Sequence, residues 1–255
     1  MTNQEKIQAY LKRIGFAGEI RLDYDTLHKL QRLHLQNIPY ENLDIMRNIP
    51  LSLEPKDMFE KIVIRGRGGY CFELNGLFTW LLRTLGFPVI EYMGRFLRDE
   101  TEIPMRRHRV MRVTCAEGDY LADVGVGQIV PRKPLPLAAG IISEQGDERY
   151  KLEMEDFLGY VLYDWKRNEW RRVYSFTEEP QLNLDFIQPT YYCENHPDSY
   201  FRTMDMVHIF TENGRKSIAG REIKIFSPEG VEVITPANEA EYKQLLDKHF
   251  GIRLR

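Results

Sequence analysis

One cysteine stands where a nucleophile could be activated. Cys71 closely follows Gly68 and Gly69 and opens a run with helical periodicity in RGRGGYCFELNGLFTWLL, residues 65–82. A thiol attacks a carbonyl as the thiolate, and an ordinary thiol pKa near 8.5 leaves little thiolate at neutral pH. The first turn of a helix offers free N–H groups and the positive end of the helix dipole, which lower a thiol pKa. The position therefore predicts a reactive Cys71, and the glycines predict space for a substrate beside it.

The alternative interpretation of an isolated cysteine is a small buried hydrophobic residue. We assign that role to Cys115, which shares strand parity with Val113, and to Cys193, which lies in the polar stretch YYCENHPD that we expect to be a loop. The three cysteines show no CxxC spacing. We therefore expect no metal site and no disulfide framework.

A reactive thiol needs a proton acceptor, and six histidines are available. Three of them fall in expected helices, where a structural role is the simpler interpretation: His28, His34 and His249. Chemistry alone leaves His196 and His208 open as candidates. The remaining one, His108, is the candidate with an acidic partner in the sequence.

His108 begins the strand-like run HRVMRV, and Asp123 follows in YLADVGVG, flanked by apolar residues. An acid in apolar surroundings needs a partner, and an imidazole N–H would provide one. Nucleophile, base and orienting acid would then be Cys71, His108 and Asp123.

A simple hairpin does not explain this pairing. If Gly118 closes a tight turn, Asp123 falls opposite about Arg112, and His108 lies four residues away, about 13 Å along the strand at the usual rise. A bulge, strong twist or wider loop would then have to bring the two side chains together.

The elements that position these residues change along the chain. Residues 1–86 show helical spacing of apolar side chains, most clearly in the run that starts at Cys71 and stops before Gly86 and Pro88. Residues 88–185 change toward a period of two, as in RVMRVTC, and further strands and a final helix follow. Helices first and strands afterwards favour an α+β fold with an antiparallel sheet or barrel.

Composition limits the function classes. The chain has 255 residues, 43% hydrophobic residues and a formal net charge of -3. This charge gives no general attraction to nucleic acid or to anionic membranes. The N-terminus lacks the apolar core of a signal peptide and no apolar run reaches membrane-spanning length, so we expect a cytoplasmic protein.

Four blocks together resemble the arylamine N-acetyltransferase family in its bacterial form. They are RGGYCFELNGLF at 67–78, IPYENLDI at 38–45, RHRV around His108, and YLADVGVG at 120–127. The blocks occur in the family's order over residues 1 to about 135, and the total length also fits. Beyond about residue 190 only the general layout is similar.

This resemblance implies a three-part fold. The expected parts are a helical bundle at 1–86 that carries the cysteine, a central β-barrel at 87–187 that carries the histidine and the aspartate, and a C-terminal α/β lid at 188–255. Cys71, His108 and Asp123 would form a triad like that of cysteine proteases and transglutaminases.

The resemblance also assigns supporting and pocket residues. Glu41 and Arg67 match an ion pair close to the family's active site, and Glu73 and Asn75 would support the site structurally. The pocket would include Phe72, Gly125, Val126 and Gly127. Many family members have an aromatic residue where this chain has Val126, so a wider or reshaped acceptor pocket is expected.

The implied chemistry is acetyl transfer from acetyl-CoA to an arylamine, arylhydrazine or N-hydroxyarylamine. It would follow a ping-pong mechanism through an acetyl-cysteine, with no metal. The expected partners are coenzyme A and a small-molecule acceptor, with neither nucleic acid nor membrane, and the chain would be a monomer or a homodimer.

Two other hypotheses remain open. One is a hydrolase or transglutaminase-like enzyme that uses the same three residues with water or another nucleophile as acceptor. The other is a binding protein with a vestigial triad. Labelled acetyl-CoA would leave one acetyl group on Cys71 in a transferase, whereas ordinary reactivity of Cys71 toward iodoacetamide would favour the binding protein.

Overall fold

The N-terminal helices form where apolar side chains recur on one face. A computed structural model describes residues 1–254. Helix α1 begins with a capping box, in which the Thr2 side chain accepts a hydrogen bond from the Glu5 N–H and the Glu5 carboxylate accepts one from the Thr2 N–H. The helices of this part are α1 (Asn3–Ile14), α2 (Tyr24–Asn37), α3 (Leu43–Met46), α4 (Pro55–Phe59) and α5 (Cys71–Leu85), with a π-helical turn at Glu60–Ile64 after α4.

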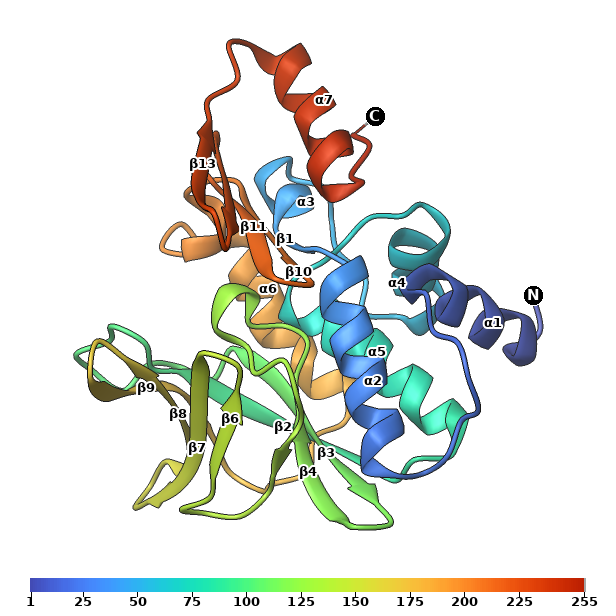
Figure 1. Cartoon of the computed structure of the whole chain (residues 1–255), viewed down its shortest axis with the longest axis vertical. Helices are drawn as coiled ribbons and strands as arrows, with labels where there is room; N and C mark the ends of the chain where they lie inside the picture. The colour runs from blue at the N-terminus through green and yellow to red at the C-terminus, as the bar shows by residue number, and fades with distance from the viewer. Residues whose placement is uncertain (255) are drawn as a thin grey trace.

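The second part is an eight-stranded antiparallel sheet, in the order β5-β4-β3-β2-β9-β8-β7-β6. It nearly closes into a barrel, because the Lys133 N–H donates to the Gln145 side chain and a bridge joins Ala139 to Leu152 (Figure 1). The strands are β2 (Val89–Phe96), β3 (His108–Cys115), β4 (Gly118–Ala122), β5 (Leu135–Pro136), β6 (Ile142–Gln145), β7 (Glu148–Glu155), β8 (Gly159–Lys166) and β9 (Glu169–Phe176).

The β3–β4 hairpin corrects the register expected from the sequence. Cys115 pairs with Gly118 and Met111 with Ala122, so Leu121, not Asp123, lies opposite Arg112. The turn is at residues 116–117, and Gly118 is already the first residue of β4. Continued by one step, this register brings Asp123 beside Val110, two residues from His108. Diagonal neighbours on one face are within reach of long side chains, so neither a bulge nor a wider loop is required.

The third part is a five-stranded antiparallel sheet, in the order β1-β10-β11-β12-β13, with α7 packed on one face. Its first strand comes from the N-terminal part of the chain, so this sheet is joined to the helices by main-chain hydrogen bonds. The bounds are β1 (Tyr40–Glu41), β10 (Met206–Thr211), β11 (Gly214–Ala219), β12 (Glu222–Ser227), β13 (Gly230–Ile234) and α7 (Glu239–Phe250).

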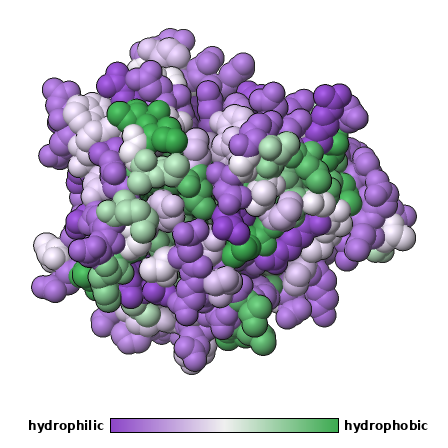
Figure 2. Space-filling view, turned by 90° about the horizontal axis from the view of Figure 1, so that it is seen from below, coloured by the Kyte–Doolittle hydropathy of each residue, from purple (hydrophilic) through white to green (hydrophobic). Residues whose placement is uncertain are grey.

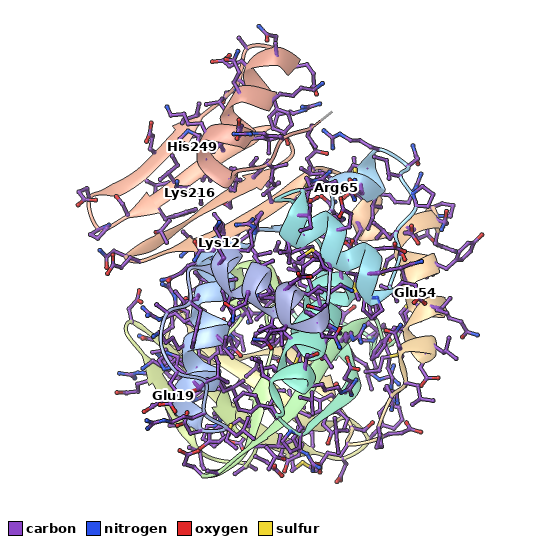
Figure 3. The ribbon with its side chains drawn as sticks, turned by 90° about the vertical axis from the view of Figure 1, so that its right-hand side faces the viewer. Lys12, Glu19, Glu54, Arg65, Lys216 and His249 are labelled. Atoms are coloured by element: carbon purple, nitrogen blue, oxygen red, sulfur yellow. The ribbon has the colours of Figure 1, made fainter. Side chains whose placement is uncertain are left out.

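Polar contacts complete the joint between α7 and this sheet. Figure 3 shows Lys216 of β11 close to His249 at the end of α7, and the Lys216 ammonium donates to the His249 carbonyl at 3.4 Å. A cation near the C-terminus of a helix is favourable because the last carbonyls have no partner inside the helix.

The connection to this sheet contains a helix that the sequence did not predict. Helix α6 (Ile187–Asn195) places Cys193 in a buried position, so the expected loop at this cysteine was wrong. Short 3-10 turns lie at Asn183–Phe186, Tyr200–Arg202 and, after β4, at Gly127–Ile129.

The predicted α+β class, with N-terminal helices, an antiparallel barrel and a C-terminal α/β part, is confirmed. The division at residues 86 and 187 stays a prediction. On the face seen from below the barrel, hydrophilic residues cover most of the surface and hydrophobic residues form separate patches (Figure 2). Within residues 1–254, every helix is too short or too polar to cross a membrane.

Candidate active site

Cys71 is the first residue of α5 because the preceding backbone is extended and capped. Tyr70 has φ -102° and ψ -173°, and its N–H donates to the Glu73 carboxylate at 3.3 Å. This contact satisfies one of the free donors at the start of the helix. The Cys71 side chain is buried, with the residue 3% exposed.

The glycines ahead of Cys71 allow the backbone to approach β1. A Cβ atom at position 68 would lie 1.9 Å from the Pro39 carbonyl oxygen. The Glu41 N–H donates to the Gly69 carbonyl at 2.8 Å, so this approach is held by a main-chain hydrogen bond. Glycine is required at position 68 by contact distance.

Gly68→Ala should therefore lower the free energy of unfolding by about 3 kcal/mol, the upper part of the usual range for overpacking. Urea unfolding measures this loss. Gly66→Asn is the matched control in the same loop, because space at position 66 is open and asparagine tolerates its left-handed backbone, with φ +68°. Equal stability of the two variants would contradict the steric argument.

His108 and Asp123 are in direct contact. The His108 Nε2 atom lies 2.7 Å from Asp123 Oδ2. The other carboxylate oxygen accepts hydrogen bonds from the Asn75 side chain at 2.8 Å and from the Gly125 N–H at 2.7 Å. Since Nε2 is held by the acid, Nδ1 is the ring nitrogen left to exchange a proton with Cys71.

Helix α5 brings the sulfur to the edge of β3. Strand β4 ends at Ala122, and beyond that point the first turns of α5 lie beside β3. The Asn75 side chain donates to the Arg109 carbonyl at 2.5 Å, and Cys71 Sγ lies 3.8 Å from the carbonyl oxygen of Arg107. The sulfur is thus next to the residue that precedes His108.

The direction of the Cys71 pKa differs from the expectation. Burial raises the pKa of the Cys71 thiol well above its ordinary value, and negative charge at Cys193 and Asp123 raises it further. The N–H groups of Arg109 and Phe72 act in the opposite direction and do not outweigh burial. The helix terminus therefore does not ionise the thiol by itself, and a proton acceptor is needed.

A buried network of charges holds the loop ahead of Cys71. The Arg67 guanidinium donates to Glu41 at 2.9 Å and to Asp44 at 2.7 Å. The Lys61 ammonium lies 2.8 Å from both Asp44 and Glu73. Burial alone would lower the pKa of Lys61, but the surrounding carboxylates, Glu73 first, raise it above its ordinary value.

The sequence analysis placed Glu41, Arg67 and Glu73 near the site but missed Asp44 and Lys61. Lys61 gave a weak signal, because it occurs beside Ile62 and Val63 in an apolar stretch. A buried pair stripped of one partner leaves an uncompensated charge, so the network favours one geometry of the loop.

A cavity of about 1090 Å³ joins the three parts of the fold. Cys71 and His108 line it, together with the predicted pocket residues Gly125, Val126 and Gly127. Gly125 packs closely on the nucleophile position, since a Cβ atom there would lie 2.7 Å from the Cys71 Cα.

Phe72 is a correction to the predicted pocket. Its side chain is fully buried and packs against Tyr70 and Phe186, with ring centroids 5.5 and 5.8 Å away. It points into this core because it follows Cys71 on the helix by one residue and therefore faces a different side. Phe72 is outside the cavity lining found for residues 1–254.

The structure also separates the other candidates. Burial raises the pKa of Cys115 and of Cys193 to about 12. His196 is largely exposed, whereas His208 lines the same cavity as Cys71. His208 is therefore the second histidine of the cavity.

Comparison with known proteins follows from this geometry. An N-acetyltransferase family model matches residues 23–255. The arylamine N-acetyltransferase of Mycolicibacterium smegmatis is 36% identical over 251 residues, covering 96% of this chain and 91% of the relative. The Salmonella typhimurium arylamine N-acetyltransferase / N-hydroxyarylamine O-acetyltransferase is 30% identical over 237 residues, covering 91% and 84%.

A solved structure agrees with these sequence matches. The Mycobacterium marinum arylamine N-acetyltransferase in complex with CoA has a TM-score of 0.89 and 32% identity, covering 96% of this chain and 92% of that chain. Identity at this level over nearly the whole length supports a shared fold and a shared family.

Proposed function

The chain belongs to the arylamine N-acetyltransferase family, and we propose that it carries the acetyl group of acetyl-CoA to an aromatic amine through a thioester on Cys71. The single observation that carries the proposal is the placement of three groups in one site. Cys71 Sγ contacts the carbonyl that precedes His108, His108 contacts Asp123, and Cys71 and His108 line one cavity.

The first half-reaction acetylates the sulfur. The Cys71 proton moves to His108 Nδ1 as Sγ attacks the thioester carbonyl, which overcomes the raised thiol pKa without a permanent thiolate. The bond between the carbonyl carbon and the coenzyme A sulfur breaks, and His108 returns the proton to the leaving thiolate. Asp123 holds the imidazolium through Nε2 during this exchange.

The second half-reaction uses the same groups in reverse. The acceptor nitrogen attacks the acetyl-cysteine carbonyl, and His108 takes the proton that the nitrogen loses. The bond from the carbonyl carbon to Sγ then breaks, and the proton returns to Cys71. An N-hydroxyarylamine could offer its oxygen in the same step.

The cavity wall supports an acceptor larger than the site would admit with an aromatic residue at position 126. Val126 packs against apolar residues of both the helices and the barrel and also lines the cavity. The C-terminal part contributes Tyr200, Met206 and His208 to the same wall. We propose that residues 188–255 act as the lid of the site.

Initial rates at several fixed acceptor concentrations test the proposal. Two substrates that share one sulfur in turn should give parallel double-reciprocal lines. Without an amine, coenzyme A release should stop after one equivalent. Intersecting lines would contradict the ping-pong order, and continuous release without amine at an undiminished rate would indicate a hydrolase.

A further inference from the structure

His208 is a buried polar residue that the proposed chemistry does not use. It lies in β10, is 5% exposed, and lines the cavity that contains Cys71 and His108. Both of its ring nitrogens are without a hydrogen-bond partner among residues 1–254. Buried nitrogens of this kind are rare in folded proteins, and each one calls for a partner.

The neighbours of His208 explain why the ring is neutral. Tyr40 and Ser217 pair with it in the adjacent strands, and its ring meets the Phe210 ring edge-on at 4.7 Å. Burial, and then the positive charges of Arg215 and Arg132, lower the pKa of His208 to about 3. At neutral pH the ring therefore carries one N–H donor and one acceptor nitrogen.

The surroundings also favour one kind of partner. Two guanidinium groups on the same side make the region positive, which favours an electron-rich oxygen near the imidazole N–H. Since neither nitrogen is engaged inside residues 1–254, turning the ring toward the cavity breaks no hydrogen bond of the described chain.

We propose that His208 is a hydrogen-bonding subsite of the substrate cavity, whose N–H binds a carbonyl or ether oxygen of a bound substrate. This inference rests on the proposed function. Two sources share the chemistry: an amide carbonyl in the arm of the thioester donor, and an oxygen substituent on the aromatic acceptor. In both cases His208 selects and positions a substrate and takes no part in proton transfer at Cys71.

Another histidine of the chain provides a matched control. His34 is fully buried and burial lowers its pKa to about 3, as for His208. However, His34 lies in the helical core, with Nδ1 2.7 Å from the Tyr10 hydroxyl and its ring 5.4 Å from the Phe78 ring. His34→Leu thus removes a similar neutral imidazole away from the cavity.

The donor is tested by binding without turnover. In a Cys71→Ser background, calorimetry would measure the dissociation constant of coenzyme A with His208, His208→Met, His208→Leu and His208→Gln. If His208 binds the donor arm, the two apolar variants should bind coenzyme A about tenfold more weakly, as for one lost hydrogen bond. His208→Gln should recover part of the affinity, since it keeps a donor and an acceptor.

The acceptor is tested by KM in the chain with Cys71 intact, using 4-methoxyaniline and the similarly sized 4-ethylaniline. If His208 binds the acceptor, His208→Met should raise the KM of the methoxy compound about tenfold and leave that of the ethyl compound unchanged. His34→Leu should change neither value.

The outcomes separate the two proposals. A tenfold change in the donor or in the methoxy acceptor supports the subsite and names its source. Unchanged affinities in both folded apolar variants, or equal losses in His208→Gln and His34→Leu, overturn it. If the Cys71→Ser protein with His208 fails to bind coenzyme A at all, the proposed function itself fails, and the subsite falls with it.

Discussion

Cys71→Ser is expected to lower the rate of acetyl transfer by about 10⁴-fold or more, as for loss of a nucleophile that acts as a unit with its base. A serine hydroxyl has a far higher pKa than a thiol and is a poorer nucleophile toward a thioester. The buried position makes ionisation of the hydroxyl harder still. Steady-state assays with acetyl-CoA and an arylamine or arylhydrazine measure the loss.

Cys115→Ser is the matched control for this substitution. Cys115 is also buried, but it lies at the far end of β3 from His108 and packs with the helical core. It should keep nearly the full rate, and both variants should unfold in urea as cooperative transitions. Turnover by a clean preparation of Cys71→Ser near the parent rate would remove Cys71 from the mechanism.

Asp123→Asn is expected to lower kcat by about 10⁴-fold, the size of effect known for the equivalent change in a serine protease triad. An asparagine can keep its oxygen toward the Asn75 amide and the Gly125 N–H, the two donors that Asp123 Oδ1 now accepts from. Its amide would then donate to His108 Nε2. The proton of the neutral ring would move to Nδ1, the nitrogen that has to accept the Cys71 proton.

Asp119→Asn provides the comparison on the same hairpin. Asp119 is exposed in β4, where its carboxylate accepts a hydrogen bond from Thr114, and it should be neutral for activity. A folded Asp123→Asn variant with a normal kcat would reduce Asp123 to a structural acid. A loss in KM alone, with kcat unchanged, would contradict the tautomer argument.

Local chemistry was readable from the sequence. The stripe of leucines after Cys71 and the terminating Gly86 define α5, and Gly86 indeed takes the left-handed backbone, with φ 101°. The acid in YLADVGVG was correctly expected to need an imidazole, and the 2.7 Å contact between His108 and Asp123 provides it.

The β3–β4 register could not be predicted from glycine positions. Gly118 has φ 140°, so it looked like a turn residue, yet it is paired in the ladder opposite Cys115. The turn therefore falls two residues earlier, and Asp123 moves closer to His108. A small shift in a turn changes every pairing that follows it.

Contacts between distant segments gave little or no signal. Tyr40 pairs with His208 across the joint between the helices and the C-terminal sheet, and Lys61 meets Glu73 inside a closed core. The raised pKa of Cys71 has the same origin, because burial depends on how all three parts pack. Sequence periodicity describes one element at a time and cannot supply these pairings.

Intact-mass measurement after mixing with acetyl-CoA, without an amine, tests the central claim most directly. The account predicts the added mass of one acetyl group, assigned to Cys71 by peptide mapping, absent in Cys71→Ser and lost when an arylamine is supplied. An acetyl group on another residue, or transfer to the amine while Cys71 never carries one, would contradict it.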